Sequence, residues 1–75
     1  MRVTLLWFAA LRERRGVASE VMDVPEGTTL AALYARCIPD DRIPVAHVRN
    51  QRVCAPDDRV ADGDEVAFLP PLGGG

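Results

Sequence analysis

The chemistry that this sequence offers lies at its end, in the segment Pro70-Pro71-Leu72-Gly73-Gly74-Gly75. Glycine has no Cβ atom, so the last three residues can extend through a passage too narrow for any side chain. The α-carboxylate of Gly75 has a reference pKa of about 3.5 and is ionised at neutral pH. A carboxylate is a fair nucleophile, and its attack on the α-phosphate of ATP would give an acyl-adenylate. Displacement of AMP by sulfide or a persulfide would then leave a thiocarboxylate.

Taken alone, the glycines are equally compatible with an inert, frayed end, because chain termini are commonly disordered. The two prolines before them stiffen the exit from the fold. The residues upstream of the tail therefore have to decide between the two interpretations.

Few other side chains suggest catalysis or metal binding. Cys37 and Cys54 lie seventeen positions apart and His47 is the single histidine, which makes a poor zinc site. Cys37 is expected to act as a small buried hydrophobe, and no His, Asp or Asn motif accompanies Cys54 to make it a nucleophile. The acidic residues before the last expected strand lack the spacing of an EF-hand calcium loop: Asp57, Asp58, Asp62 and Asp64. We therefore expect no metal site.

Charge and composition exclude further classes. The net charge is -2, from 9 basic and 11 acidic residues, so there is no basic footprint for nucleic acid or for a membrane surface. All the basic residues are arginines, and without lysine the chain has no side-chain amine for a Schiff base or an isopeptide bond. No signal peptide or membrane-spanning run of about 20 apolar residues is found, so we expect a cytoplasmic protein with reduced thiols.

The apolar pattern predicts an α+β domain over residues 1–69, followed by a flexible tail at residues 70–75. The principal helix should begin after Thr28 or Thr29, end by Pro39, and bury a stripe at i, i+3, i+4 and i+7: Leu30, Leu33, Tyr34 and Cys37. A short helix at 9–15 should follow the first strand and end at Gly16, and Asn50-Gln51 should form a tight turn with positive φ. Strands are expected at residues 2–8, 19–24, 45–49, 52–54 and 65–69.

Two segments at opposite ends of the chain carry a resemblance to a known family. The last fourteen residues resemble the C-terminal signature of the molybdopterin synthase small subunit, or molybdopterin converting factor subunit 1. They read Asp62-Gly63-Asp64-Glu65-Val66-Ala67-Phe68-Leu69-Pro70-Pro71-Leu72-Gly73-Gly74-Gly75. The run Phe8-Ala9-Ala10-Leu11-Arg12-Glu13-Arg14-Arg15-Gly16 resembles that family's N-terminal signature. The resemblance covers essentially the whole chain.

This resemblance implies a ubiquitin-like β-grasp fold, in which a mixed sheet carries one principal helix and its first and last strands pair. It implies that a ubiquitin-activating-type adenylyltransferase consumes ATP to adenylate Gly75, and that a sulfur donor then converts Gly75 to a thiocarboxylate. Gly74 and Gly75 would enter the synthase large subunit, within a heterotetramer, and donate sulfur to cyclic pyranopterin monophosphate. The chain would then be a sulfurtransferase subunit without a catalytic pocket or stably bound cofactor of its own.

The resemblance also assigns residues to the contact with the large subunit. Phe8, Val53 and Phe68 correspond to apolar positions at that interface in the family, and Leu72 of the tail is assigned to it as well. Their apolar side chains are also compatible with core or ordinary surface positions. Trp7, in contrast, is expected in the core.

The third glycine keeps alternatives open. The family usually ends in prolines, two variable residues and Gly-Gly, whereas a triple glycine resembles the thiamine-pathway sulfur carriers, which share the fold. Sulfur transfer to thiamine or tRNA, a ubiquitin-like modifier, and an interaction module with an inert tail therefore remain as alternatives. Pro70-Pro71 and Phe68 favour molybdopterin.

Overall fold

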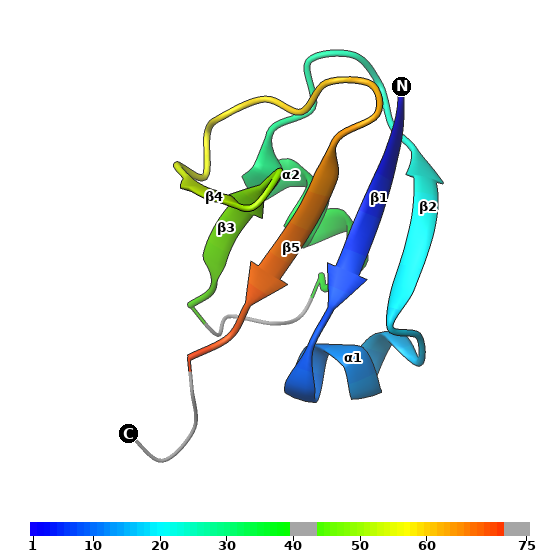
Figure 1. The fold of residues 1–75 in the computed structure, drawn as a ribbon, viewed down its shortest axis with the longest axis vertical. Helices are drawn as coiled ribbons and strands as arrows, with labels where there is room; N and C mark the ends of the chain where they lie inside the picture. Colours follow the sequence, from blue (N-terminus) through cyan, green and yellow to red (C-terminus); the bar gives the residue numbers. More distant parts are fainter. Residues whose placement is uncertain (40–43, 72–75) are drawn as a thin grey trace.

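The computed structural model describes residues 1–39 and 44–71, in which five strands form a single mixed sheet accompanied by two helices (Figure 1). The α+β architecture expected from the sequence is confirmed, and each expected element is present to within a few residues. The elements, in chain order, are β1 (Arg2–Trp7), α1 (Ala9–Arg15), β2 (Ser19–Asp23), α2 (Leu30–Cys37), β3 (Ala46–Arg49), β4 (Arg52–Cys54) and β5 (Glu65–Leu69).

The strand order across the sheet is β2-β1-β5-β3-β4. The first and last strands, β1 and β5, lie side by side and run parallel, with Leu5 opposite Val66 and Trp7 opposite Phe68. The other neighbouring strands pair antiparallel. Because β1 and β5 point the same way, the chain leaves the sheet after Leu69 at the end where β1 finishes and α1 begins (Figure 1).

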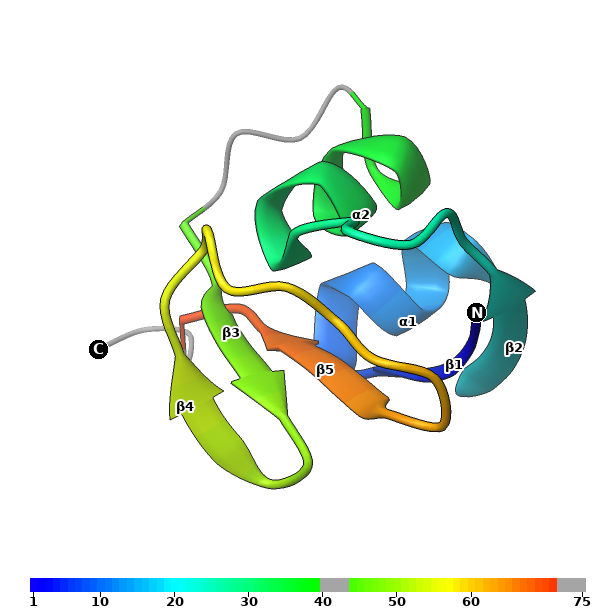
Figure 2. The same cartoon turned by 90° about the horizontal axis from the view of Figure 1, so that it is seen from above.

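The core lies between the sheet and α2, which covers one face of the sheet (Figure 2). Alternate residues of β1 and β5 point to this side, and the buried stripe of α2 matches the expected spacing. Thr29 is the N-cap of α2 and its side chain accepts a hydrogen bond from the Ala32 amide at 3.1 Å. The largest fully buried side chains include Trp7, Phe68, Leu5, Leu30 and Leu33.

The short helix α1 closes the end of the core with Leu11, which is 1% exposed. It ends as expected at Gly16, whose φ of 79° is the left-handed conformation that glycine adopts without steric cost. Neither helix of the described part is long and apolar enough to cross a membrane.

Candidate functional site

The site expected to carry chemistry is the tail, and the structure describes its first two residues. Pro70 is half-buried and Pro71 is exposed directly after β5. Leu72, Gly73, Gly74 and Gly75 lie outside the described residues, so their assigned roles stay predictions. The structure does describe the surface of the domain from which the tail begins.

The face of the sheet opposite α2 is not covered by any element of residues 1–39 and 44–71 (Figures 1 and 2). The register places apolar residues of neighbouring strands in a continuous row on this face: Leu6 lies opposite Ala67, Ala67 opposite Val48, and Val48 opposite Val53. We call this surface the open-face patch, and it comprises Leu6, Val21, Val48, Val53, Ala67 and Leu69.

The open-face patch holds three of the five large hydrophobic residues that are strongly exposed in the described chain. Val53 is 77% exposed, Val21 60% and Leu69 39%. Phe8, 45% exposed, directly follows β1 at the end of the sheet where the tail begins. An apolar surface with these exposures on one side of a small domain is characteristic of a protein-binding site.

The far end of the same face is polar. Arg2 and Asp23 lie opposite each other and form an exposed ion pair with 3.5 Å between Arg2 Nε and Asp23 Oδ1. Glu65 begins β5 at this end, whereas Leu69 ends it beside the tail. The apolar character of the face therefore increases toward the tail.

Phe68 does not lie on this surface, which corrects the sequence-based assignment of its side chain to a partner interface. It is 0% exposed and packs in the core against Trp7, Tyr34 and His47, with ring centroids 5.6, 5.0 and 5.7 Å away. Consecutive residues of a strand point to opposite faces, so Ala67 and Leu69 occupy the open face instead. Trp7, at 1% exposed, is in the core as expected.

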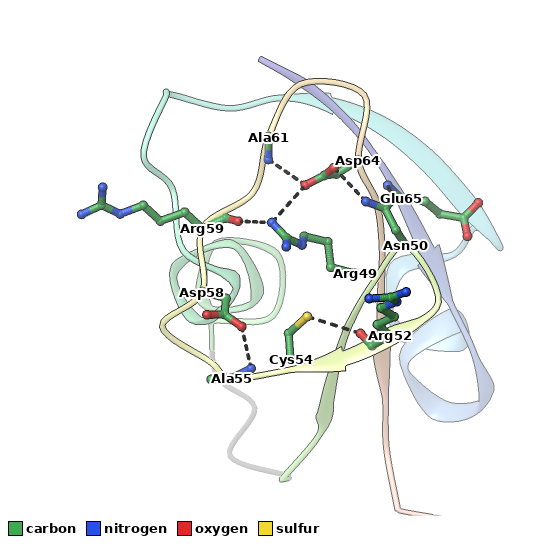
Figure 3. A network of polar contacts seen from close by, with 10 residues as sticks. All are labelled: Arg49, Asn50, Arg52, Cys54, Ala55, Asp58, Arg59, Ala61, Asp64 and Glu65. Atoms are coloured by element: carbon green, nitrogen blue, oxygen red, sulfur yellow. Dashed lines mark hydrogen bonds and ion pairs between the residues drawn. The ribbon is translucent and has the colours of Figure 1, made fainter.

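Asp64 has a structural role in the loop that leads into β5 (Figure 3). Only 8% exposed, it accepts hydrogen bonds from Asn50 Nδ2 at 3.0 Å and from the Ala61 amide at 2.7 Å. Asn50 in turn accepts a hydrogen bond from the Glu65 amide at 2.9 Å. These bonds tie the turn between β3 and β4 to the start of β5. The Asp-Gly-Asp-Glu part of the C-terminal signature therefore has a role in folding.

Cys37 is placed as the sequence suggested. Cys37 is buried, and this burial raises the pKa of its thiol. Cys54 is half-buried and its Sγ donates to the Arg52 carbonyl at 3.4 Å. Among the described residues, no group of three or more His, Cys, Asp and Glu side chains gathers where it could hold a metal ion.

Arg15 has an environment that the sequence did not reveal. Its guanidinium forms a two-point ion pair with Glu20, with Nη2–Oε1 2.7 Å and Nε–Oε2 2.9 Å. It also donates to the Cys37 carbonyl at 3.2 Å and lies 5.8 Å from the Trp7 ring centre. Arg15 thus connects α1, β2 and the end of α2.

Mixed sheet, packed helix and parallel pairing of the first and last strands together define a ubiquitin-like β-grasp domain. The solved structure of SAMP1 from Haloferax volcanii, small archaeal modifier protein 1, is similar with a TM-score of 0.83 and 25% identity over all of both chains. A putative molybdopterin converting factor subunit 1 from Pyrococcus furiosus matches with a TM-score of 0.77 and 25% identity, over 96% of this chain and 99% of the other.

Sequence comparison identifies the family within this fold. The model of the ThiS family matches residues 5–75, and the chain belongs to that family. Two relatives carry the name molybdopterin synthase sulfur carrier subunit. The one from Chlamydomonas reinhardtii is 36% identical with all of both chains covered, and the one from Homo sapiens is 33% identical over 99% of this chain and 94% of the relative.

Proposed function

We propose that this chain is the sulfur carrier subunit of a molybdopterin synthase. The observation that carries the proposal is the continuity between the open-face patch and the end of β5, where the tail begins. A partner that binds the patch would hold the domain with its tail at the partner's surface. Family membership and the shared name of the two relatives support the same function.

The proposed chemistry takes place at Gly75. Its carboxylate oxygen attacks the α-phosphate of ATP on an adenylyltransferase of the ubiquitin-activating type, and pyrophosphate leaves. Sulfide-level sulfur from a donor then attacks the acyl carbon and displaces AMP, which leaves a C-terminal thiocarboxylate. The carrier next docks on the synthase large subunit and donates this sulfur to cyclic pyranopterin monophosphate, while water cleaves the acyl–sulfur bond and returns Gly75 to a carboxylate. Gly74 and Gly75 are narrow enough to enter a closed active site.

Mass spectrometry of the intact protein tests the first half of this proposal. Incubation with an activating enzyme, ATP and a sulfur donor should raise the mass by about 16 Da, since sulfur replaces one carboxylate oxygen. Deletion of Gly75 should abolish molybdopterin formation with the large subunit while circular dichroism stays unchanged. An unchanged mass, with an enzyme preparation that loads a known carrier, would contradict the proposal, and so would full synthase activity without Gly75.

A ubiquitin-like modifier is the second candidate, and the similarity to SAMP1 is the observation that favours it. This function predicts adducts in which Gly75 is linked to lysines of other proteins. Affinity purification of the tagged chain distinguishes the candidates, because a carrier recovers a synthase large subunit without an isopeptide bond. Recovery of a thiazole synthase would instead indicate the thiamine pathway.

A further inference from the structure

The outer edge of β2 is a second interaction surface, which borders the open-face patch and shares Val21 with it. β2 is the last strand on one side of the sheet, and no described segment pairs with its outer edge (Figure 1). The opposite edge strand, β4, has three residues, whereas β2 has five. Edge strands are commonly protected from pairing by shortness, by charged side chains and especially lysine, by proline or by a bulge. β2 pairs with β1 in unbroken register and contains neither lysine nor proline, and its two charged side chains are already paired within the chain, Glu20 with Arg15 and Asp23 with Arg2.

The register with β1 identifies the backbone groups that face outward. Val24 donates to the Met1 carbonyl at 2.8 Å, and Trp7 donates to the Ala18 carbonyl at 2.8 Å. Inward and outward positions alternate along an antiparallel strand, so residues 18, 20, 22 and 24 bond to β1. The N–H and C=O groups of Ser19, Val21 and Asp23 therefore point away from the sheet.

We propose that this edge pairs antiparallel with the same edge of a second copy of the chain, with Val21 on the two-fold axis. Val21 then faces Val21 of the second copy, and the two exchange both backbone hydrogen bonds. Ser19 faces Asp23 of the second copy, and Asp23 faces its Ser19. All three residues of the edge that point outward are used, and the two sheets become continuous.

The side chains are self-complementary in this register. The Asp23 carboxylate accepts a hydrogen bond from the Ser19 hydroxyl of the second copy, and no like charges stand opposite each other. Val21, 60% exposed in one copy, is covered by its equivalent. On the other face Glu20 stands opposite Met22, and its carboxylate is already held by Arg15 and Trp7 within its own chain.

The pairing is compatible with tail chemistry in both copies. A two-fold axis perpendicular to the sheet leaves both open-face patches on the same side and sends the two β5 strands in opposite directions. The two tails then begin at opposite ends of the joined sheet. Since the contact involves five residues from each copy, the interface is small and the dimer is a weak, reversible one.

Sedimentation equilibrium of the full chain from about 10 µM to about 1 mM tests the pairing. The wild type should show a concentration-dependent dimer. Ser19→Asp places a carboxylate opposite Asp23 twice in the dimer and should raise the dissociation constant about tenfold. Ser19→Asn, of similar size and uncharged, is the matched control and should change it little. The double variant Ser19→Asp with Asp23→Lys should restore association, because each carboxylate then faces an ammonium group.

Val21→Pro provides an independent test of the edge. The Val21 N–H makes no bond to β1 in this register, so proline removes an outward donor without removing a hydrogen bond of the domain. Val21→Thr keeps the N–H and the branched side chain, and should dimerise. A wild type that is monomeric throughout the range overturns the proposal. So does a dimer that Ser19→Asp or a folded Val21→Pro leaves unchanged, since such a dimer would use another surface.

Discussion

Glu20 accepts hydrogen bonds from two side chains that are distant in sequence, Arg15 and Trp7. The Arg15 guanidinium holds it at two points, and Trp7 Nε1 donates to Oε2 at 2.7 Å. The ion pair is partly shielded from water, with side-chain exposures of 27% for Arg15 and 22% for Glu20. Its geometry is the two-point arrangement in which arginine–carboxylate pairs are strongest. Glu20 is thus the residue that fixes α1 against the sheet.

The pH dependence of stability should reveal this pair. Hydrogen bonding from Arg15, supported by Trp7, lowers the pKa of Glu20 below its ordinary value of 4.5 despite partial burial. A carboxylate whose pKa is lower in the folded state stabilises the fold above its unfolded pKa, and this contribution is lost as the pH falls through the folded pKa. Glu20→Gln should therefore reduce the free energy of unfolding by about 1–3 kcal/mol at neutral pH.

The measurement is urea unfolding of wild type and Glu20→Gln between pH 7 and pH 2. The difference between the two proteins should be constant above about pH 5 and shrink below about pH 4.5. Comparing the two curves cancels the titration of the other carboxylates, which both proteins share. A difference that does not depend on pH would mean that the Glu20 charge contributes nothing beyond its hydrogen bonds.

Trp7, Arg15 and Glu20 also show which features of the fold could be predicted from the sequence and which could not. Local spacing identified the core position of Trp7 and the buried stripe of α2, since both depend on periodicity. It could not pair Arg15 with Glu20, because the contact requires α1 to fold back beside β2. Phe68 was assigned to the interface because it corresponds to an apolar interface position of the family, but strand alternation turns its side chain into the core.

At the scale of elements, Asn50 is the link between the β3–β4 turn and β5. Its φ of 52° and the φ of 69° at Gln51 confirm the expected turn with positive φ. The sequence did not reveal that the Asn50 side chain also bridges Asp64 and the Glu65 amide (Figure 3). That bridge depends on a contact between segments about fourteen residues apart. The strands themselves were predictable because they are set by local apolar patterns.

Asn50→Gly should isolate the energy of this bridge. Glycine accepts the positive φ, so the change removes the two side-chain hydrogen bonds without adding backbone strain. It also leaves the partly buried carboxylate of Asp64 with one donor fewer. We expect a loss of about 1–2 kcal/mol in the free energy of unfolding.

Gln51→Gly is the matched control for Asn50→Gly. It makes the same substitution at the neighbouring residue of the same turn, which also has positive φ. Thermal or urea unfolding of both variants should show the loss for Asn50→Gly and a change within about 0.5 kcal/mol for Gln51→Gly. Equal losses would assign the effect to the flexibility of glycine in the turn and not to the hydrogen bonds of Asn50.

At the scale of the whole molecule, one face of the sheet provides the stability of the domain and the opposite face is available for binding. The face toward α2 holds the core, and the open face carries apolar residues that contribute little to it. A chain this small buries a limited share of its surface, and no described element covers the open-face patch. Changes on the open face should therefore affect binding of the synthase large subunit without unfolding the carrier.

Val53→Asp tests this separation most directly, since Val53 is 77% exposed at the end of the row that Leu6, Ala67 and Val48 begin. In a complex it would bury a carboxylate against an apolar surface, so the affinity for the large subunit, measured by titration calorimetry, should fall about tenfold or more.

Val17→Asp is the matched control: Val17 is also exposed, at 42%, but lies in the loop between α1 and β2 and outside the patch. Both variants should keep the melting temperature of the wild type within a few degrees. If both bind as tightly as the wild type, the open face is not the docking surface. If both weaken binding equally, the loss reflects added negative charge, and the apolar row has no special part in recognition.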